Sequence, residues 1–217
     1  MDKIYILALI PALLFFSCGG TPASRNHSHT EVDITPQIAE PYTIIDFKGK
    51  ESDGQIPTWV NLYLDGGAKN IEILTPYHDR FVFVSRNAGA NFNALMLWTE
   101  GFSPELDFPR MAAARVDARL TYTVPFPDAE YGAFYETLIR AASDAPWQGA
   151  TKEDDFWILR RYSDSEAWEF MILVSIEKSV FTSQLNRIFD SVSPSPQPSR
   201  DQISAANRIK DRFFEGF

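Results

Sequence analysis

The most regular hydrophobic pattern of the chain lies in residues 168–177. Five apolar side chains occupy every second position there: Trp168, Phe170, Ile172, Val174 and Ile176. A period of two predicts a β-strand with one continuous apolar face, which has to be buried against helices. Residues 156–162 form another β-rich run, and the polar residues 163–166 between the two runs predict a turn. This part of the chain therefore predicts a β-hairpin.

Extended structure is also predicted near the start of the folded region. Residues 42–48 are rich in β-branched and aromatic side chains and predict a first strand. Residues 56–60 form a short apolar motif, and Pro57 within it favours an extended backbone. Residues 65–67, Asp-Gly-Gly, predict a turn that follows this motif.

Two more strands are predicted at residues 71–74 and 80–86, joined by a hairpin-like connection at residues 76–79. Residues 81–84, Phe-Val-Phe-Val, would be apolar on both faces of such a strand. A strand that is buried on both faces is typical of the interior of a sheet. We therefore expect residues 80–86 to form a central strand.

Helical periodicity describes most of the remaining apolar positions. From about Asp107 a helix is predicted with Pro109 in its first turn and Ala112, Val116 and Leu120 facing the sheet. Residues 152–155 are charged and predict a solvated turn. Further helices are expected at residues 91–101, 128–142 (with Asp128 as the N-cap) and 179–192. These patterns together predict an α+β fold, a mainly antiparallel sheet covered by helices.

The sequence predicts a single domain with additional segments before and after it. The expected divisions are a signal peptide at residues 1–17, a flexible tether at 18–41, the α+β domain at 42–192, a Ser/Pro linker at 193–200 and an amphipathic helix at 201–217. We expect Asp201 to cap this last helix. The helix either folds back on the domain or docks on another protein, and we favour folding back because its exposed Phe side chains would be costly.

The first eighteen residues predict where the protein is found. A charged start is followed by an apolar run at residues 4–16, then Ser17 and Cys18, the single cysteine of the chain. The segment Phe15-Phe16-Ser17-Cys18 resembles the lipobox of bacterial lipoproteins. The resemblance implies that Cys18 is linked to diacylglycerol, becomes the first residue after cleavage and is N-acylated. The expected location is the bacterial cell envelope, with the lipid as anchor to a membrane facing the periplasm or the exterior.

Composition limits the classes of partner. Apolar residues make up 45% of the chain and aromatic residues 14%, which is typical of a folded protein. The formal net charge is -9, so the surface repels phosphate backbones and anionic lipid headgroups. We therefore expect no nucleic-acid partner, and contact with the membrane only through the lipid.

Three segments of the domain resemble a known family. They are Pro57-Thr58-Trp59-Val60, the alanine-rich stretch with Ala112-Ala113-Ala114-Arg115 and Arg119-Leu120, and the hairpin from Phe156-Trp157-Ile158 to Glu177-Lys178. Together they resemble the LPP-twenty-type family of small bacterial lipoproteins over about residues 56–189. The resemblance implies an α+β envelope lipoprotein and carries over no catalytic residues.

Histidine-based chemistry has few candidates in this sequence. Only His78 lies in the folded region, and its neighbour Asp79 would point away from it in a strand, so we interpret His78 as a turn residue. In the tether, His27, His29, Glu31 and Asp33 alternate, but a flexible segment gives metal ligands no fixed geometry. We predict no metal site, no cofactor and no catalytic residue.

Carboxylates and aromatic residues give the remaining candidates. Residues 153–155, Glu-Asp-Asp, are the densest acidic cluster, and such a run is typically a solvated face. Trp98, Phe102 and Glu105 are candidate ligand-binding residues, since rings beside carboxylates can bind sugars or peptides. The alternative for them is a core edge and a helix start.

Three functions follow from these observations. The leading hypothesis is a lipid-anchored envelope protein without enzymatic activity, which acts through protein contacts or in assembly. The alternative is a periplasmic or surface binding module for a small apolar or sugar ligand. A hydrolase that uses carboxylates comes third, because no nucleophile elbow, zinc motif or phosphate loop is present in the sequence.

Overall fold

The computed structural model describes residues 41–123 and 129–215. The described elements are, in chain order, β1 (Thr43–Phe47), η1 (Lys50–Ser52), α1 (Thr58–Gly66), α2 (Ala68–Ile71), η2 (Thr75–Tyr77), β2 (Arg80–Gly89), α3 (Phe92–Glu100), α4 (Pro104–Thr123), α5 (Ala129–Asp144), β3 (Thr151–Arg161), β4 (Glu166–Glu177), α6 (Lys178–Ser191) and α7 (Arg200–Phe214). Here η marks a short 3-10 helix.

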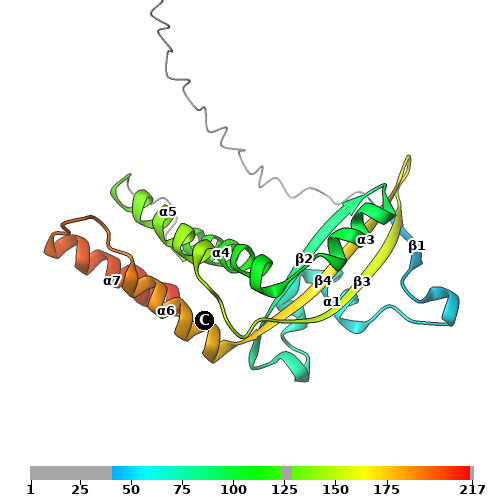
Figure 1. Cartoon of the computed structure of the whole chain (residues 1–217), viewed down its shortest axis with the longest axis horizontal. Helices are drawn as coiled ribbons and strands as arrows, with labels where there is room; N and C mark the ends of the chain where they lie inside the picture. Colours follow the sequence, from blue (N-terminus) through cyan, green and yellow to red (C-terminus); the bar gives the residue numbers. More distant parts are fainter. Residues whose placement is uncertain (1–40, 124–128, 216–217) are drawn as a thin grey trace, which may run out of the picture. The chain divides into compact units, whose positions relative to one another are not determined.

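The strands form one antiparallel sheet in the order β1-β3-β4-β2. Its centre is the predicted hairpin of β3 and β4, which pair from Thr151 opposite Ser175 to Arg161 opposite Glu166. Figure 1 shows β4 running directly into α6, the helix that was predicted to follow it. The α+β class, a single antiparallel sheet with helices over it, is confirmed.

The sheet buries a different core on each face. The main core joins alternate residues of β2 and β4, among them Phe83 and Ile172, to α4, α5, α6 and α7. The second core joins the intervening residues, among them Val82 and Met171, to Trp59 of α1 and to α2. Because side chains alternate along a strand, β2 and β4 contribute to both cores and are apolar on both faces.

The prediction that residues 80–86 form a central strand is wrong. β2 lies at the outer end of the sheet and pairs with β4 alone. Its double-sided burial comes from helices, since Phe81 and Phe83 lie in the main core and Val82 in the second core. An apolar run indicates that both faces of a strand are buried, but it does not indicate the position of the strand in the sheet. Helices can cover both faces of an edge strand as well as those of a central strand.

Two of the predicted extended segments are helical. Residues 56–60 were expected to be extended, but α1 begins at Thr58, directly after Pro57 (φ −57°, ψ 145°). Proline restricts the residue before it and leaves the residues after it free to be helical. The strand predicted at residues 71–74 is also absent, since Ile71 ends α2. Of the residues predicted to form the hairpin connection, Pro76 and Tyr77 lie in η2.

Two boundaries differ from the prediction. Residues 152–155 were predicted to be a solvated turn, but they lie inside β3, with a bulge between Lys152 and Asp154. The second predicted helix begins at Pro104 and not near Asp107. Proline is tolerated at a first helical position because its missing N–H needs no partner there. The predicted core positions Ala112, Val116 and Leu120 of this helix are buried.

The C-terminal helix α7 folds back on the domain. Phe213 is fully buried in the main core, Ile209 is nearly so, and Lys210 Nζ lies 2.5 Å from Asp190 Oδ1 of α6. The N-cap is Ser199 and not Asp201 as predicted, because Ser199 and Gln202 form a reciprocal capping box. Within the described residues, none of the helices has the length and apolar character that a bilayer span requires.

Several predicted features lie outside the described residues. These are the leader and Cys18, the tether residues His27, His29, Glu31 and Asp33, and the Asp128 cap.

Candidate functional site

The outer edge of β2 leaves backbone groups without partners. In an antiparallel pair, successive residues direct their N–H and C=O groups to opposite sides of the strand. Val82 directs its groups outward, because both bond to residues beyond the edge. Val84 and Arg86 have the same parity, and their outward backbone groups have no hydrogen-bond partner in the part of the chain that the structure describes.

One end of this edge is closed by an ion pair. The Val82 N–H donates to Glu72 Oε1 at 3.0 Å, and Arg115 Nη1 donates to the Val82 carbonyl at 3.3 Å. Arg115 Nη1 also donates to Glu72 Oε1 at 3.1 Å. We call these three residues the clamp. It blocks strand pairing at Val82, a common protection of exposed edges.

Beyond the clamp, the β2 edge lines an open groove of about 520 Å³ between α2 and α4. Its apolar lining includes Ala68 of α2, Val84 of β2, and Met111 and Ala114 of α4. Arg110 from α4 also lines it and keeps 79% of its side chain exposed. The groove therefore combines apolar walls, a strand edge and solvent access.

A second hollow of about 410 Å³ continues on the other side of the clamp. Lys69 and Arg115 line both hollows, and Arg119, Tyr122 and Lys178 line the second one. Tyr122 is 80% exposed, which is unusual for a large ring. We call the two hollows together the basic groove.

Charge is strongly segregated in the basic groove. Six of the 20 Lys and Arg residues of the chain line it, and Glu72 is the one carboxylate among its lining residues. The whole protein carries a formal charge of -9, so this surface has the opposite sign to the rest. The six cations are Lys69, Arg86, Arg110, Arg115, Arg119 and Lys178.

Aromatic rings of the core hold some of these cations in place. The Arg115 guanidinium carbon lies 4.3 Å from the centroid of the Phe81 ring and 5.1 Å from that of Phe83. Lys178 Nζ lies 5.7 Å from the Phe81 centroid. Cation–π contacts of this kind fix the position of a positive charge without neutralising it. Arg115 also pairs with Glu72, so of these two cations Lys178 is the one whose charge stays able to attract an anion.

Arg86 links the groove to a buried charge cluster on the second face of the sheet. Glu169 has 2% of its side chain exposed, and its two carboxylate oxygens lie 2.5 Å from Arg86 Nε and 2.5 Å from Arg160 Nη2. Burial raises the pKa of Glu169, and the two guanidiniums offset this only in part. The Arg160 guanidinium also lies over the Tyr42 ring at 4.0 Å. This cluster joins β2, β3 and β4, which indicates a structural role.

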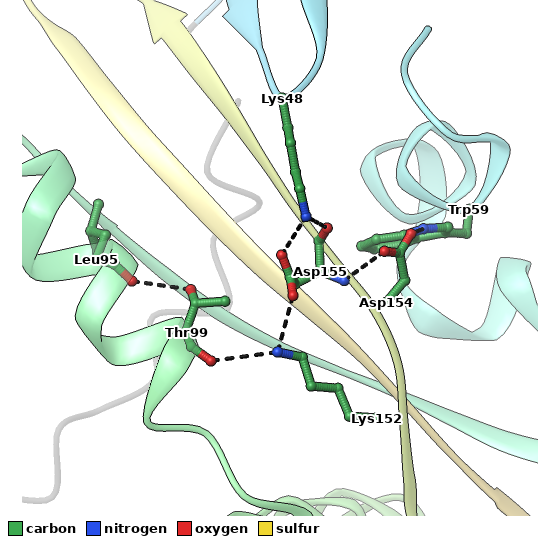
Figure 2. A network of polar contacts seen from close by, with 7 residues as sticks. All are labelled: Lys48, Trp59, Leu95, Thr99, Lys152, Asp154 and Asp155. Atoms are coloured by element: carbon green, nitrogen blue, oxygen red, sulfur yellow. Dashed lines mark hydrogen bonds and ion pairs between the residues drawn. The ribbon is translucent and has the colours of Figure 1, made fainter. Parts of the chain in front are cut away.

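Figure 2 shows a second polar network, in which the charges are matched. Asp155 Oδ1 accepts a hydrogen bond from Lys48 Nζ at 2.6 Å, and Asp155 Oδ2 lies 3.0 Å from Lys152 Nζ. Burial by itself raises the pKa of Asp155, but the hydrogen bonds from the two lysines outweigh it and hold the pKa below its ordinary value. Asp154 Oδ2 accepts from Trp59 Nε1 at 2.9 Å. We call this set the Asp155 network.

The Asp155 network ties several elements to the bulge of β3. Lys48 follows β1, Trp59 belongs to α1, and Lys152 Nζ donates to the Thr99 carbonyl of α3 at 3.5 Å. The third member of the acidic run, Glu153, accepts a hydrogen bond from Ser175 Oγ and lies 3.6 Å from Arg80. Each carboxylate of residues 153–155 is thus engaged in holding strands and helices together.

The three predicted ligand-binding residues lie at the α3–α4 junction. Trp98 and Phe102 are partly buried against the main core. Glu105 is exposed in the first turn of α4, where its hydrogen bond from Ser103 Oγ at 2.6 Å lowers its pKa. Ring packing on the core and a helix-start contact account for all three positions.

His78 does meet its neighbour. His78 Nε2 lies 3.0 Å from Asp79 Oδ2, so the prediction that these consecutive side chains point apart is wrong. They precede β2, where the chain is not extended and the alternation of a strand does not apply. Both side chains are largely exposed, at 66% and 84%. No group of three or more potential metal-ligating side chains occurs among residues 41–123 and 129–215.

Sequence reasoning missed the basic groove because its cations are dispersed between Lys69 and Lys178. Only Arg115 and Arg119, four residues apart on one helix face, gave a local signal.

No protein-family model matches the chain, and neither the curated proteins nor the solved structures compared with it give a significant match. The resemblance to the LPP-twenty-type lipoproteins and the lipobox therefore stay predictions.

Proposed function

We propose that this chain is a lipid-anchored cell-envelope protein that acts by binding another protein, and that the basic groove is the contact surface. The observation that carries the proposal is the open edge of β2 inside that groove. Proteins normally pair, cover or blunt such edges, because an exposed edge recruits other strands. Here the clamp covers the edge at Val82 and leaves it open at Val84 and Arg86.

The anchor in this proposal rests on the leader sequence and Cys18. A lipid at the start of the tether would hold the domain near the membrane, which raises its effective concentration toward membrane-bound partners. A weak contact at the groove would then be sufficient for function.

Site-specific crosslinking in living cells tests the contact surface. A photoreactive amino acid in place of Lys69, which lines both hollows, is expected to give a discrete adduct with an envelope protein. The same residue in place of Asp164, in the exposed β3–β4 turn, is the matched control and should give none. Equal adduct patterns from both positions would reject the groove as the contact surface.

The anchor has its own test. Cys18→Ser should leave the protein in the soluble fraction or as an uncleaved precursor, whereas the unaltered protein should partition into detergent. Mass analysis of the mature N-terminus should find an acylated Cys18. An unmodified cysteine still joined to its leader would contradict the lipid anchor.

A small apolar or sugar ligand is the second candidate for the same surface. The volume of about 520 Å³ and the apolar lining by Val84, Met111 and Ala114 favour it. A small ligand of this kind would fill the apolar part, so its affinity should depend little on salt. A ligand that binds in this way and abolishes the Lys69 adduct would favour this candidate over a protein partner.

A further inference from the structure

We propose that the occupant of the basic groove is an extended acidic segment of a partner protein, which adds to β2 as a further strand of the sheet. This inference rests on the proposed function and names the chemistry of the partner. Three observations carry it: the open backbone edge, the apolar walls on both sides of it, and the surplus of positive charge around it.

The backbone edge sets the conformation of the bound partner segment, which we call the guest. Val84, Arg86 and Ala88 share the outward parity of Val82, so their N–H and C=O groups are available on the side away from β4. A guest strand that bonds to these groups has to be extended. The clamp ends the pairing at Val82, so the paired stretch runs from Val84 to Ala88, about 17 Å of strand.

The two walls receive the side chains of the guest. Alternate side chains of an added strand point to opposite faces of the sheet. Those on one face meet Met111 and Arg110 of α4, and those on the other meet Ala68 and Lys69 of α2. Both walls therefore offer an apolar contact beside a cation. A guest with apolar and acidic residues close together satisfies both.

The charge of the groove selects an acidic guest. Arg86, Arg110 and Arg115 each have one carboxylate partner, whereas Lys69 has none among the described residues. Glu72 is the one acidic residue lining either hollow, so a guest carboxylate meets little repulsion there. Complementary charge would speed association and disfavour basic segments.

The probe for the test is an acetylated octapeptide with two repeats of Glu-Glu-Val-Val, which places both Glu and Val on each face of an extended strand, and it is labelled with a fluorophore. Its binding to the full chain in detergent micelles is measured by fluorescence anisotropy. Two matched peptides isolate the two parts of the inference. One replaces every Glu with Lys, and the other carries methyl groups on its backbone nitrogens, so that it keeps the charges and cannot donate backbone hydrogen bonds.

We expect the acidic peptide to bind and each matched peptide to bind at least about tenfold more weakly. Arg110→Glu should weaken the acidic peptide by about tenfold and improve the Lys peptide, while Glu166→Lys, on the exposed start of β4, should change neither by more than about twofold. Raising the salt from about 50 to about 300 mM should weaken binding of the acidic peptide, because exposed charges are screened.

Other results would overturn the inference in distinguishable ways. If the methylated peptide binds as tightly as the acidic peptide, strand addition is ruled out. If the Lys peptide binds as tightly, the preference for an acidic segment is ruled out. A Lys69 adduct between two copies of this chain would make the occupant a second copy. If no peptide binds while the Lys69 adduct with an envelope protein still forms, the acidic guest is rejected and the contact surface stands. If both fail, the proposed function fails as well.

Discussion

The Asp155 network and the basic groove use similar residues in opposite ways. In the network, Asp155 lies between two lysines, and Asp154 accepts from Trp59, so the charges and donors are matched. In the groove, six cations line a surface that holds one carboxylate, and the adjacent strand edge keeps backbone groups that have no partner among the described residues. Three of these cations also have a carboxylate partner. Matched polar groups stabilise a fold, whereas an excess of positive charge and open backbone groups on a solvent-accessible surface leave interactions available to a partner.

Substitutions in the two regions are expected to lower the free energy of unfolding by different amounts. Removing a matched, buried group should cost the most, and replacing an exposed groove cation should cost the least. Urea unfolding with linear extrapolation measures each change.

The largest effect is expected for Glu169→Ala. The change leaves the buried Arg160 guanidinium without its carboxylate, and breaking a buried ion pair in this way costs about 3–5 kcal/mol. Glu166→Ala is the matched control on the same strand, since the Glu166 side chain is 46% exposed and pairs with the exposed Arg161. It should cost less than about 1 kcal/mol. A loss at Glu169 no larger than at Glu166 would mean that this cluster is not structural.

An intermediate effect is expected for Glu72→Ala. The change leaves the Val82 N–H without an acceptor and Arg115 without its partner, which should cost about 1–3 kcal/mol. It also opens the β2 edge at Val82, so concentration-dependent self-association should appear in light scattering. Glu72→Gln keeps an oxygen acceptor for the Val82 N–H and should cost less. An equal loss from both variants would contradict the clamp as an edge cap.

A smaller, pH-dependent effect is expected for Asp155→Asn. The pKa of Asp155 is lower in the folded protein than its ordinary value of 3.8, so its charged form is favoured by folding. This stability is present above about pH 4 and is lost as the pH falls through the lower, folded-state pKa. We expect the variant to lose about 1 kcal/mol at neutral pH, and the difference from the unaltered protein to shrink below pH 4.

The control for this pH dependence is Asp164→Asn, in the exposed β3–β4 turn. It removes an exposed carboxylate outside the Asp155 network and should change the free energy of unfolding at neutral pH by less than about 0.5 kcal/mol. A constant difference between the Asp155 variant and the unaltered protein from about pH 3 to pH 7 would show that the charge of Asp155 contributes nothing.

The smallest effect on stability is expected for Arg110→Glu in the groove. Arg110 is largely exposed, and its one ion pair within the described part of the chain is with Asp107 on its own helix, so the change should stay within about 1 kcal/mol. The main effect of Arg110→Glu should be weaker binding of an acidic partner, because the new carboxylate repels the partner's negative charge. A destabilisation as large as that of Glu169→Ala would remove the contrast between the two regions.

The sequence by itself determined the elements whose residues carry a local signal. The alternation from Trp168 to Ile176 predicted β4, which pairs with β3 as expected. The stripe of Phe181, Leu185 and Ile188 predicted α6, and all three side chains are buried. Asn91 predicted the start of α3, where its side chain accepts from the Ala94 N–H at 3.1 Å. Each of these signals acts between residues that are close in the chain.

Tertiary structure alone decided where β2 lies and what surrounds it. Residues 81–84 are apolar on both faces, which does not tell a central strand from an edge strand covered by helices. The clamp joins Glu72 to Arg115, and the basic groove gathers cations from Lys69 to Lys178. Such sites depend on which distant elements pack together. Because burial of apolar surface is non-directional, the local sequence of one element does not identify the element that packs against it.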